Sequence, residues 1–174
     1  MRSASFNSRV IRQVVVCTFV SCLVYGATTD SAFAKKNARP FGGRVVAAWD
    51  NVFAALPMPV GAGTANFSGI SQMKHMGRSG QVGTLHLGFP HPATGLAPGN
   101  GSVTITANNG DTVSFDYQGI LNSATGEGAG TLVITGGTGR FQGATGCGTF
   151  HALIDISAPA NQSMTVLLDG KILY

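Results

Sequence analysis

Charged residues are scarce in this chain of 174 residues. Asp, Glu, Lys and Arg make up 10% of the sequence, while apolar residues make up 44%. Disordered chains have high net charge and low hydrophobicity, and coiled coils are rich in Glu and Lys, so both classes are excluded. With only seven acidic residues in the whole chain, the carboxylate pair of a glycosidase is poorly provided for.

The first 34 residues have the pattern of a secretory signal peptide. A basic start precedes an almost uncharged apolar run at 14–27, and the sequence Ser-Ala-Phe-Ala at 31–34 places small residues at the −3 and −1 positions of a signal-peptidase site. At about 14 residues, the run is shorter than the roughly 20 that a membrane-spanning helix needs. We therefore predict a signal peptide at 1–34 and a secreted or periplasmic protein without a stable membrane span.

Two alternatives to this cleavage stay open, an uncleaved anchor and lipoprotein processing at Cys22. Removal of the segment leaves Cys147 as the single cysteine, so no intrachain disulfide is expected. No Lys or Arg adjoins Cys147 to stabilise a thiolate, and we interpret it as a small buried residue. The removed segment also carries part of the positive charge. The domain at 35–174 therefore lacks the clustered basic face that nucleic-acid binding requires.

Glycine, in contrast, is abundant, at 25 residues. It has no strict three-residue period, which excludes collagen. Because glycine is unfavourable inside helices, a glycine-dense apolar chain favours short strands joined by tight turns. The strongest local pattern is a β-hairpin, in which alternating segments at 103–108 and 112–117 flank Asn109-Gly110. That dipeptide suits a type I′ turn.

The rest of the domain also reads as strands and turns. Prolines and glycines predict a loop at 89–101. Segment 44–55 fits a strand, although its apolar spacing also fits a helix. Further strands are predicted at 65–70, 72–78, 81–88, 131–135, 148–156, 164–168 and 171–174. We therefore predict an all-β protein, a single antiparallel barrel or sandwich of about eight strands.

The densest glycine segment, 135–146, has the look of a nucleotide-binding turn. A dinucleotide site needs that turn to open a helix in a βαβ unit, and a P-loop needs Gly-Lys-Ser/Thr. Here a strand is predicted to follow and the P-loop residues are absent. We interpret the segment as a tight connection in which glycines permit positive φ and two side chains pin the turn to the barrel. This structural motif comprises Gly136, Gly137, Gly139, Arg140, Phe141, Gly143 and Gly146.

The segment 134–146, preceded by 106–111, resembles bacterial secreted proteins with an allene oxide cyclase-like (dirigent-like) barrel domain. Residues 73–78 resemble a segment that these proteins often carry as Thr-His-Leu-Gly-Arg, and the likeness covers roughly 69–156. The resemblance implies an eight-stranded antiparallel barrel with an apolar interior. In the plant relatives this interior shelters a reactive intermediate while it cyclises or couples. The catalytic positions of the plant enzymes do not match this sequence, so their chemistry is not carried over.

Few residues are candidates for chemistry. The four histidines, His75, His86, His91 and His151, lack the strand or helix spacing that brings two metal ligands together, so we predict neither a metal site nor a cofactor. No catalytic residue is assigned. As polar groups that would converge in an open apolar cavity, His75, Arg78 and His86 are the candidate ligand-binding residues.

Two functions stay open. One is a non-catalytic exported barrel that binds an apolar small molecule or an envelope partner, or has only a structural role in the envelope. The other is a cyclase-like or dirigent-like isomerase that shapes a reactive apolar substrate inside the barrel. The isomerase needs an open apolar cavity with a few polar groups, whereas a structural barrel is filled by its own side chains. The sequence does not indicate whether the protein forms homo-oligomers.

Overall fold

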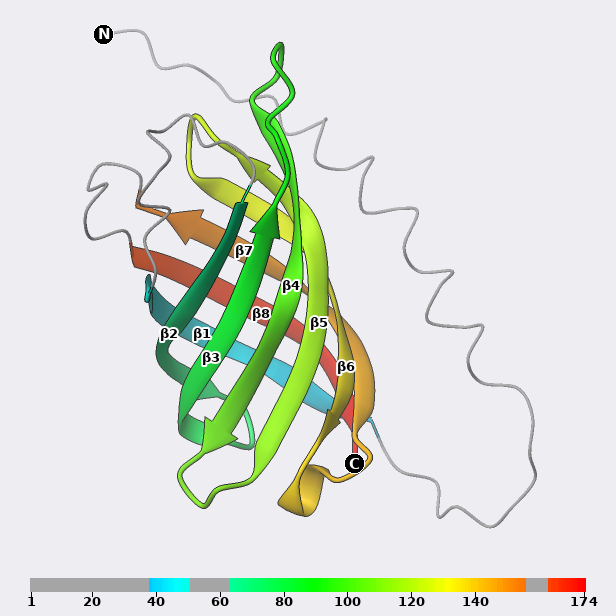
Figure 1. Cartoon of the computed structure of the whole chain (residues 1–174). Coiled ribbons are helices and arrows are strands. Elements are labelled where there is room, and N and C mark those ends of the chain that lie inside the picture. The colour runs from blue at the N-terminus through cyan, green and yellow to red at the C-terminus, as the bar shows by residue number, and fades with distance from the viewer. Residues whose placement is uncertain (1–37, 51–62, 156–162) are drawn as a thin grey trace, which may run out of the picture. The chain divides into compact units, whose positions relative to one another are not determined.

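The computed structural model describes residues 38–50, 63–155 and 163–174. They form a closed antiparallel barrel in which each strand pairs with the next and β8 pairs with β1 (Figure 1). This confirms the predicted class. The strands are β1 (Arg39–Trp49), β2 (Gly63–Met73), β3 (Gly77–Leu87), β4 (Leu96–Ala107), β5 (Thr112–Asn122), β6 (Glu127–Gly137), β7 (Thr145–Ile154) and β8 (Ser163–Leu173).

Side chains alternate between the barrel interior and the outer surface, as the two-residue period of a strand requires. In β4, Val103, Ile105 and Ala107 are buried. Thr104 between them faces outward and lies 3.0 Å from Ser114 of β5, hydroxyl to hydroxyl. The predicted pairing of these two strands into a hairpin is confirmed by a register that runs without a break from Leu96 to Thr106.

The turn of this hairpin is not the predicted type I′. The Gly110 N–H donates to the Ala107 carbonyl and the Ala107 N–H donates to the Asp111 carbonyl, each at 2.9 Å. Gly110 has a φ of 87°, whereas Asn109 has no positive φ. The loop therefore holds three residues, of which only glycine adopts the left-handed conformation. It avoids the cost of placing the Cβ of Asn109 in that region.

The predicted loop at 89–101 is too long, because β4 begins at Leu96. Pro98 is tolerated inside a strand because the β3–β4 pairing ends at Leu87 and Gly99. One residue further, the Pro98 carbonyl accepts a hydrogen bond from the Gly88 N–H at 2.8 Å. A proline that only accepts at the end of a ladder loses little, since its missing N–H is not needed there.

Other predicted boundaries also change. Segment 65–70 lies within β2, whereas the segment predicted as a strand at 72–78 contains the end of β2, a turn at 74–76 and the first two residues of β3. Segments 164–168 and 171–174 merge into β8. The predicted strand at 44–55 begins earlier, at Arg39, and its last five residues lie outside the described part of the chain. Cys147 is half-buried rather than buried.

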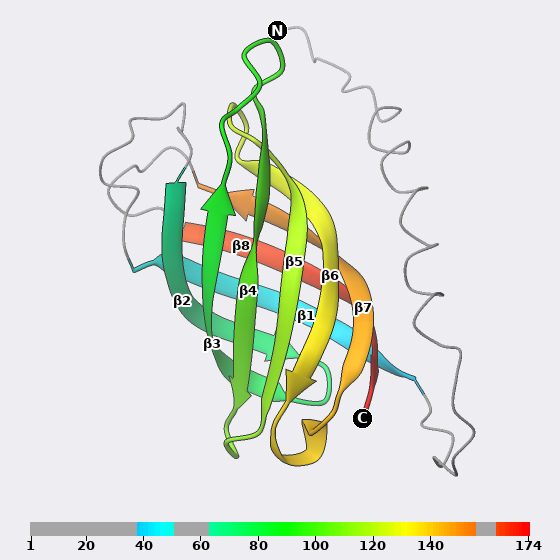
Figure 2. The same ribbon diagram turned by 45° about the vertical axis from the view of Figure 1, so that its right-hand side comes forward.

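The connections divide between the two ends of the barrel (Figures 1 and 2). The turns at 74–76, 108–111 and 138–144 lie at one end, which we call the closed end. The connections at 88–95 and 123–126 lie at the other, which we call the pocket end. In the described ranges no helix is long and apolar enough to cross a membrane.

Candidate functional site

The closed half of the barrel interior is filled by its own side chains. Its residues include the largest fully buried side chains of the described structure, and Phe141 from the short 3-10 helix η1 (Gly139–Phe141) is among them. Fully buried side chains that interdigitate in this way leave little room for a ligand. The side chains concerned are Phe41, Ile105, Val113, Leu132, Phe141 and Ile172.

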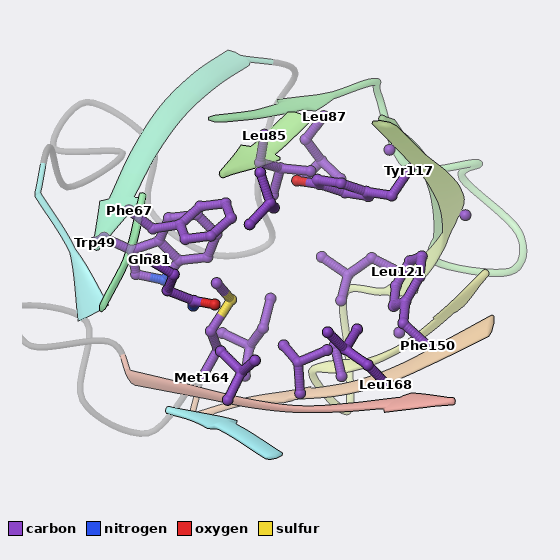
Figure 3. A pocket seen from close by; sticks show the side chains of 18 of the residues that line it. Trp49, Phe67, Gln81, Leu85, Leu87, Tyr117, Leu121, Phe150, Met164 and Leu168 are labelled. Atoms are coloured by element: carbon purple, nitrogen blue, oxygen red, sulfur yellow. The ribbon is translucent and has the colours of Figure 1, made fainter. Parts of the chain in front are cut away.

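The half toward the pocket end is hollow. It contains a cavity of about 90 Å³ whose wall is almost entirely apolar (Figure 3). The wall comes mainly from the second halves of β1, β3, β5 and β7 and from the first halves of β2, β4, β6 and β8. Principal lining residues are Trp49, Phe67, Gln81, Leu85, Leu87, Tyr117, Leu121, Phe150, Met164 and Leu168.

Glycines in the barrel wall explain how this half stays hollow. The ring of Phe67 lies over Gly83 of the neighbouring strand, where a Cβ would collide with its Cζ atom. The ring of Phe150 lies over Gly119 and Gly130, where a Cβ would come within 2.8 and 2.7 Å of ring carbons. Because these inward positions lack side chains, the rings lie against the wall instead of filling the centre. The glycines thus leave space inside the barrel as well as forming turns between strands.

The rings also support one another. Trp49 and Phe67 pack edge to face with centroids 5.6 Å apart, and Tyr117 and Phe150 do so at 5.5 Å. Contacts of this geometry contribute roughly 0.5–1.5 kcal/mol beyond the burial of apolar area. The two pairs form preorganised parts of the pocket wall.

Besides the indole of Trp49, two polar side chains line the pocket, Gln81 and Tyr117. The Tyr117 hydroxyl donates to the Thr84 carbonyl at 2.8 Å. Burial raises the pKa of Tyr117 well above its ordinary value, because the phenolate would lose hydration. Tyr117 therefore stays neutral at physiological pH. Gln81 is 5% exposed and its side chain is among those directed into the pocket in Figure 3.

No protein-family model and no curated protein matches this sequence. Among solved structures, the chain is similar to a pterocarpan synthase dirigent protein, with 12% identity, a TM-score of 0.47, and coverage of 86% of this chain and 99% of the other. It is also similar to a pyocyanin demethylase, with 16% identity, a TM-score of 0.37, and coverage of 75% and 99%. A dirigent protein is thus among the structures similar to this chain. At these identities, neither protein's activity bears on what this chain does.

The three residues predicted to face a cavity lie on the outer surface instead. Arg78 and His86 occupy outward positions of β3, between the inward Ser79, Gln81, Leu85 and Leu87. They are eight residues apart on one strand, which separates them by roughly 26 Å. The ring Nδ1 of His86 lies 2.8 Å from the Thr64 hydroxyl oxygen. His75 is exposed in the β2–β3 turn with a φ of 66°. The pocket therefore uses none of them, because strand alternation points Arg78 and His86 outward and His75 lies in a turn at the closed end.

The glycine-rich segment connects β6 to β7 at the closed end. Gly139 has a φ of 58°, and a Cβ there would collide with the Asp111 side chain. Beside it, the Arg140 Nε lies 3.3 Å from the Asp111 Oδ2, and its Nη2 donates to the His75 carbonyl at 2.8 Å. Arg140 thereby ties together the three turns of the closed end. Phe141, which is 1% exposed, inserts beneath it.

Sequence reasoning missed Gln81 and the ring–glycine pairs. Leu85 and Leu87 are in phase with Gln81 but Val82 is on the opposite phase, so the sequence alone does not decide that Gln81 faces inward. A glycine opposite an aromatic residue could have been found only with the register of neighbouring strands in hand. Within the described ranges, no three His, Cys, Asp or Glu side chains lie close enough together to hold a metal ion.

Proposed function

We propose that this protein is an exported β-barrel that binds an apolar small molecule in the pocket between Trp49, Phe67, Tyr117 and Phe150. One observation carries the proposal: half of the interior is packed solid, while the other half holds a cavity of about 90 Å³ with an apolar wall. Apolar cavities of about 150 Å³ take up benzene in water. At about 90 Å³ this pocket is smaller, but it is partly open, so a small ring compound can occupy it and extend toward the opening.

The polar groups of the pocket support binding more than acid–base chemistry. An amide such as that of Gln81 neither takes up nor releases a proton near neutral pH. The raised pKa of Tyr117 and its bond to Thr84 keep its proton in place. An isomerase that shapes a reactive apolar substrate is the alternative, favoured by the same open apolar pocket. The isomerase differs from a binding protein because the molecule that it releases is chemically changed from the one that it bound.

Native mass spectrometry of the purified protein tests the binding. We expect a bound species whose added mass matches a single small apolar molecule, and extraction into organic solvent identifies it. The isolated molecule is then incubated with fresh protein and analysed chromatographically over time. An unchanged compound supports a binding protein, and a converted one supports the isomerase. Bare protein that also fails to take up isopropylbenzene in a calorimetric titration would contradict the pocket as a binding site.

Export is tested by the fate of the first 34 residues. When the full chain is produced in bacteria, we expect the periplasm or the medium to contain protein that begins at Lys35, because Ala32 and Ala34 satisfy the small-residue requirement of signal peptidase. Intact-mass measurement and N-terminal sequencing check this. The matched variant Ala34→Arg should accumulate uncleaved. Native protein that retains Met1 would contradict cleavage, and a lipid-modified Cys22 would replace it with lipoprotein processing.

A further inference from the structure

We propose that Gln81 is the polar anchor of the pocket and that the ligand is a neutral, mainly apolar molecule with one hydrogen-bonding group, a carbonyl or a hydroxyl, that pairs with the Gln81 amide. This inference rests on the proposed binding function and specifies its ligand class. It makes Gln81 the residue that distinguishes such a molecule from a plain hydrocarbon of the same size.

The position of Gln81 places its side chain inside the barrel. It lies midway along β3, paired with Gly69 of β2 and Ile105 of β4. Ile105 is fully buried and belongs to the filled half, whereas Gln81 lines the pocket. Gln81 therefore sits where the hollow half meets the filled half. In Figure 3 its amide group points into the space that the apolar lining side chains surround.

The hydrogen bonding of Gln81 differs from that of the other buried polar residues. Ser71 donates to the Ser79 carbonyl, Ser79 to carbonyls of the adjoining turn, and Ser123 to the Gly95 carbonyl. In the described part of the chain, the Gln81 side chain has no hydrogen-bond partner. The protein does not fully enclose the amide atoms of Gln81. Because Gln81 lines the pocket, these atoms face its open space.

An amide in this position needs a partner, because a buried polar group without one destabilises the fold. The amide offers an N–H₂ donor and a carbonyl acceptor, so it pairs with a ligand carbonyl or hydroxyl. Among the described lining residues, none carries a charge. A carboxylate or an ammonium group would lose its hydration without gaining a counter-ion, which excludes it energetically. The chemistry therefore selects a neutral ligand.

Calorimetric titration with two probes of matched size tests the anchor. Acetophenone carries a carbonyl, and isopropylbenzene has a methyl-bearing carbon in its place. In Gln81→Met, which keeps the length of the side chain but removes the amide, we expect the affinity for acetophenone to fall about 5- to 10-fold, the usual range for one neutral hydrogen bond. The affinity for isopropylbenzene should stay the same or rise. Gln81→Leu serves as a second apolar variant, and benzoate tests the exclusion of charge.

The outcomes separate the anchor from the pocket. A variant that loses affinity for acetophenone but not for isopropylbenzene supports Gln81 as the anchor. An equal change in affinity for both probes overturns the anchor but not the pocket. Such a result would mean that the Gln81 amide bonds to water whether or not a ligand is bound. Binding of neither probe to the native protein overturns both proposals. Benzoate binding as tight as acetophenone binding overturns the neutral ligand class.

Discussion

Gly128→Leu is expected to reduce the binding of isopropylbenzene at least 10-fold without destabilising the barrel. Gly128 lies on β6 and lines the pocket. A Cβ there would rest 3.5 Å from the Ala152 Cβ and 3.6 Å from the Leu121 Cδ1, which is ordinary van der Waals contact. The leucine side chain can therefore enter the cavity of about 90 Å³ and occupy the space that a ligand would use. Calorimetric titration and thermal unfolding measure the two effects.

Two further glycines provide controls for this substitution. Gly130, two residues along the same strand, has no such room, because a Cβ would lie 2.7 Å from the Phe150 ring and 2.6 Å from the Gly119 Cα. Gly130→Ala should therefore cost about 1–3 kcal/mol of unfolding free energy through overpacking. Gly80→Leu adds the same side chain outside the barrel, where a Cβ meets nothing within 4 Å, and should leave binding unchanged. Native-like binding in Gly128→Leu would show that the ligand site lies elsewhere.

Phe141→Ala is expected to lower the free energy of unfolding by about 3–5 kcal/mol, as removal of a fully buried phenylalanine does. The ring is 1% exposed and packs against Tyr174 with centroids 4.7 Å apart. The Arg140 guanidinium lies over the Phe141 ring, 4.8 Å from its centroid. Such a loss is a large fraction of the 5–15 kcal/mol typical of a whole domain. Urea unfolding monitored by fluorescence of Trp49 provides the measurement.

The exposed Phe89 is the matched control for Phe141. It is 77% exposed, so Phe89→Ala should change the unfolding free energy by no more than about 0.5 kcal/mol. If Phe141→Ala costs less than about 1 kcal/mol, the closed end is not held by this ring, and the glycine-rich connection is a loop without a structural role. Ligand binding in the surviving folded protein should be retained, because Phe141 does not line the pocket.

The prediction of the hairpin at 103–117 and the prediction of its turn show where local sequence suffices. The alternation of side chains along a strand has a two-residue period whichever strands lie beside it. Val103, Ile105 and Val113 were therefore placed correctly. The type of turn depends on which residue takes a positive φ. Asn109-Gly110 allows two solutions, and the structure uses the one that leaves Asn109 out of the left-handed region.

The candidate site was predicted less well than the fold. His75, Arg78 and His86 were selected by residue type, because polar groups suit a cavity. The exposure of Arg78 and His86 follows from alternation in β3, whose inward set begins at Ser79 and includes Gln81, and His75 is exposed in the turn before that strand. The sequence leaves the phase of β3 ambiguous, since Val82 is on the opposite phase from Leu85 and Leu87, and the structure exposes Val82. One step of phase decides between an outer surface and a pocket wall.

The sequence by itself determined the all-β class, the main hairpin and the position of the tight glycine-rich connection, because each depends on residues that are close neighbours in the chain. Only the tertiary structure decided that one half of the barrel is filled and the other hollow. That difference arises because the strand register places Phe67 over Gly83 and Phe150 over Gly119 and Gly130. The same register sets the amide of Gln81 among apolar neighbours. Contacts between residues on different strands made the pocket, and no pattern within a single strand encodes them.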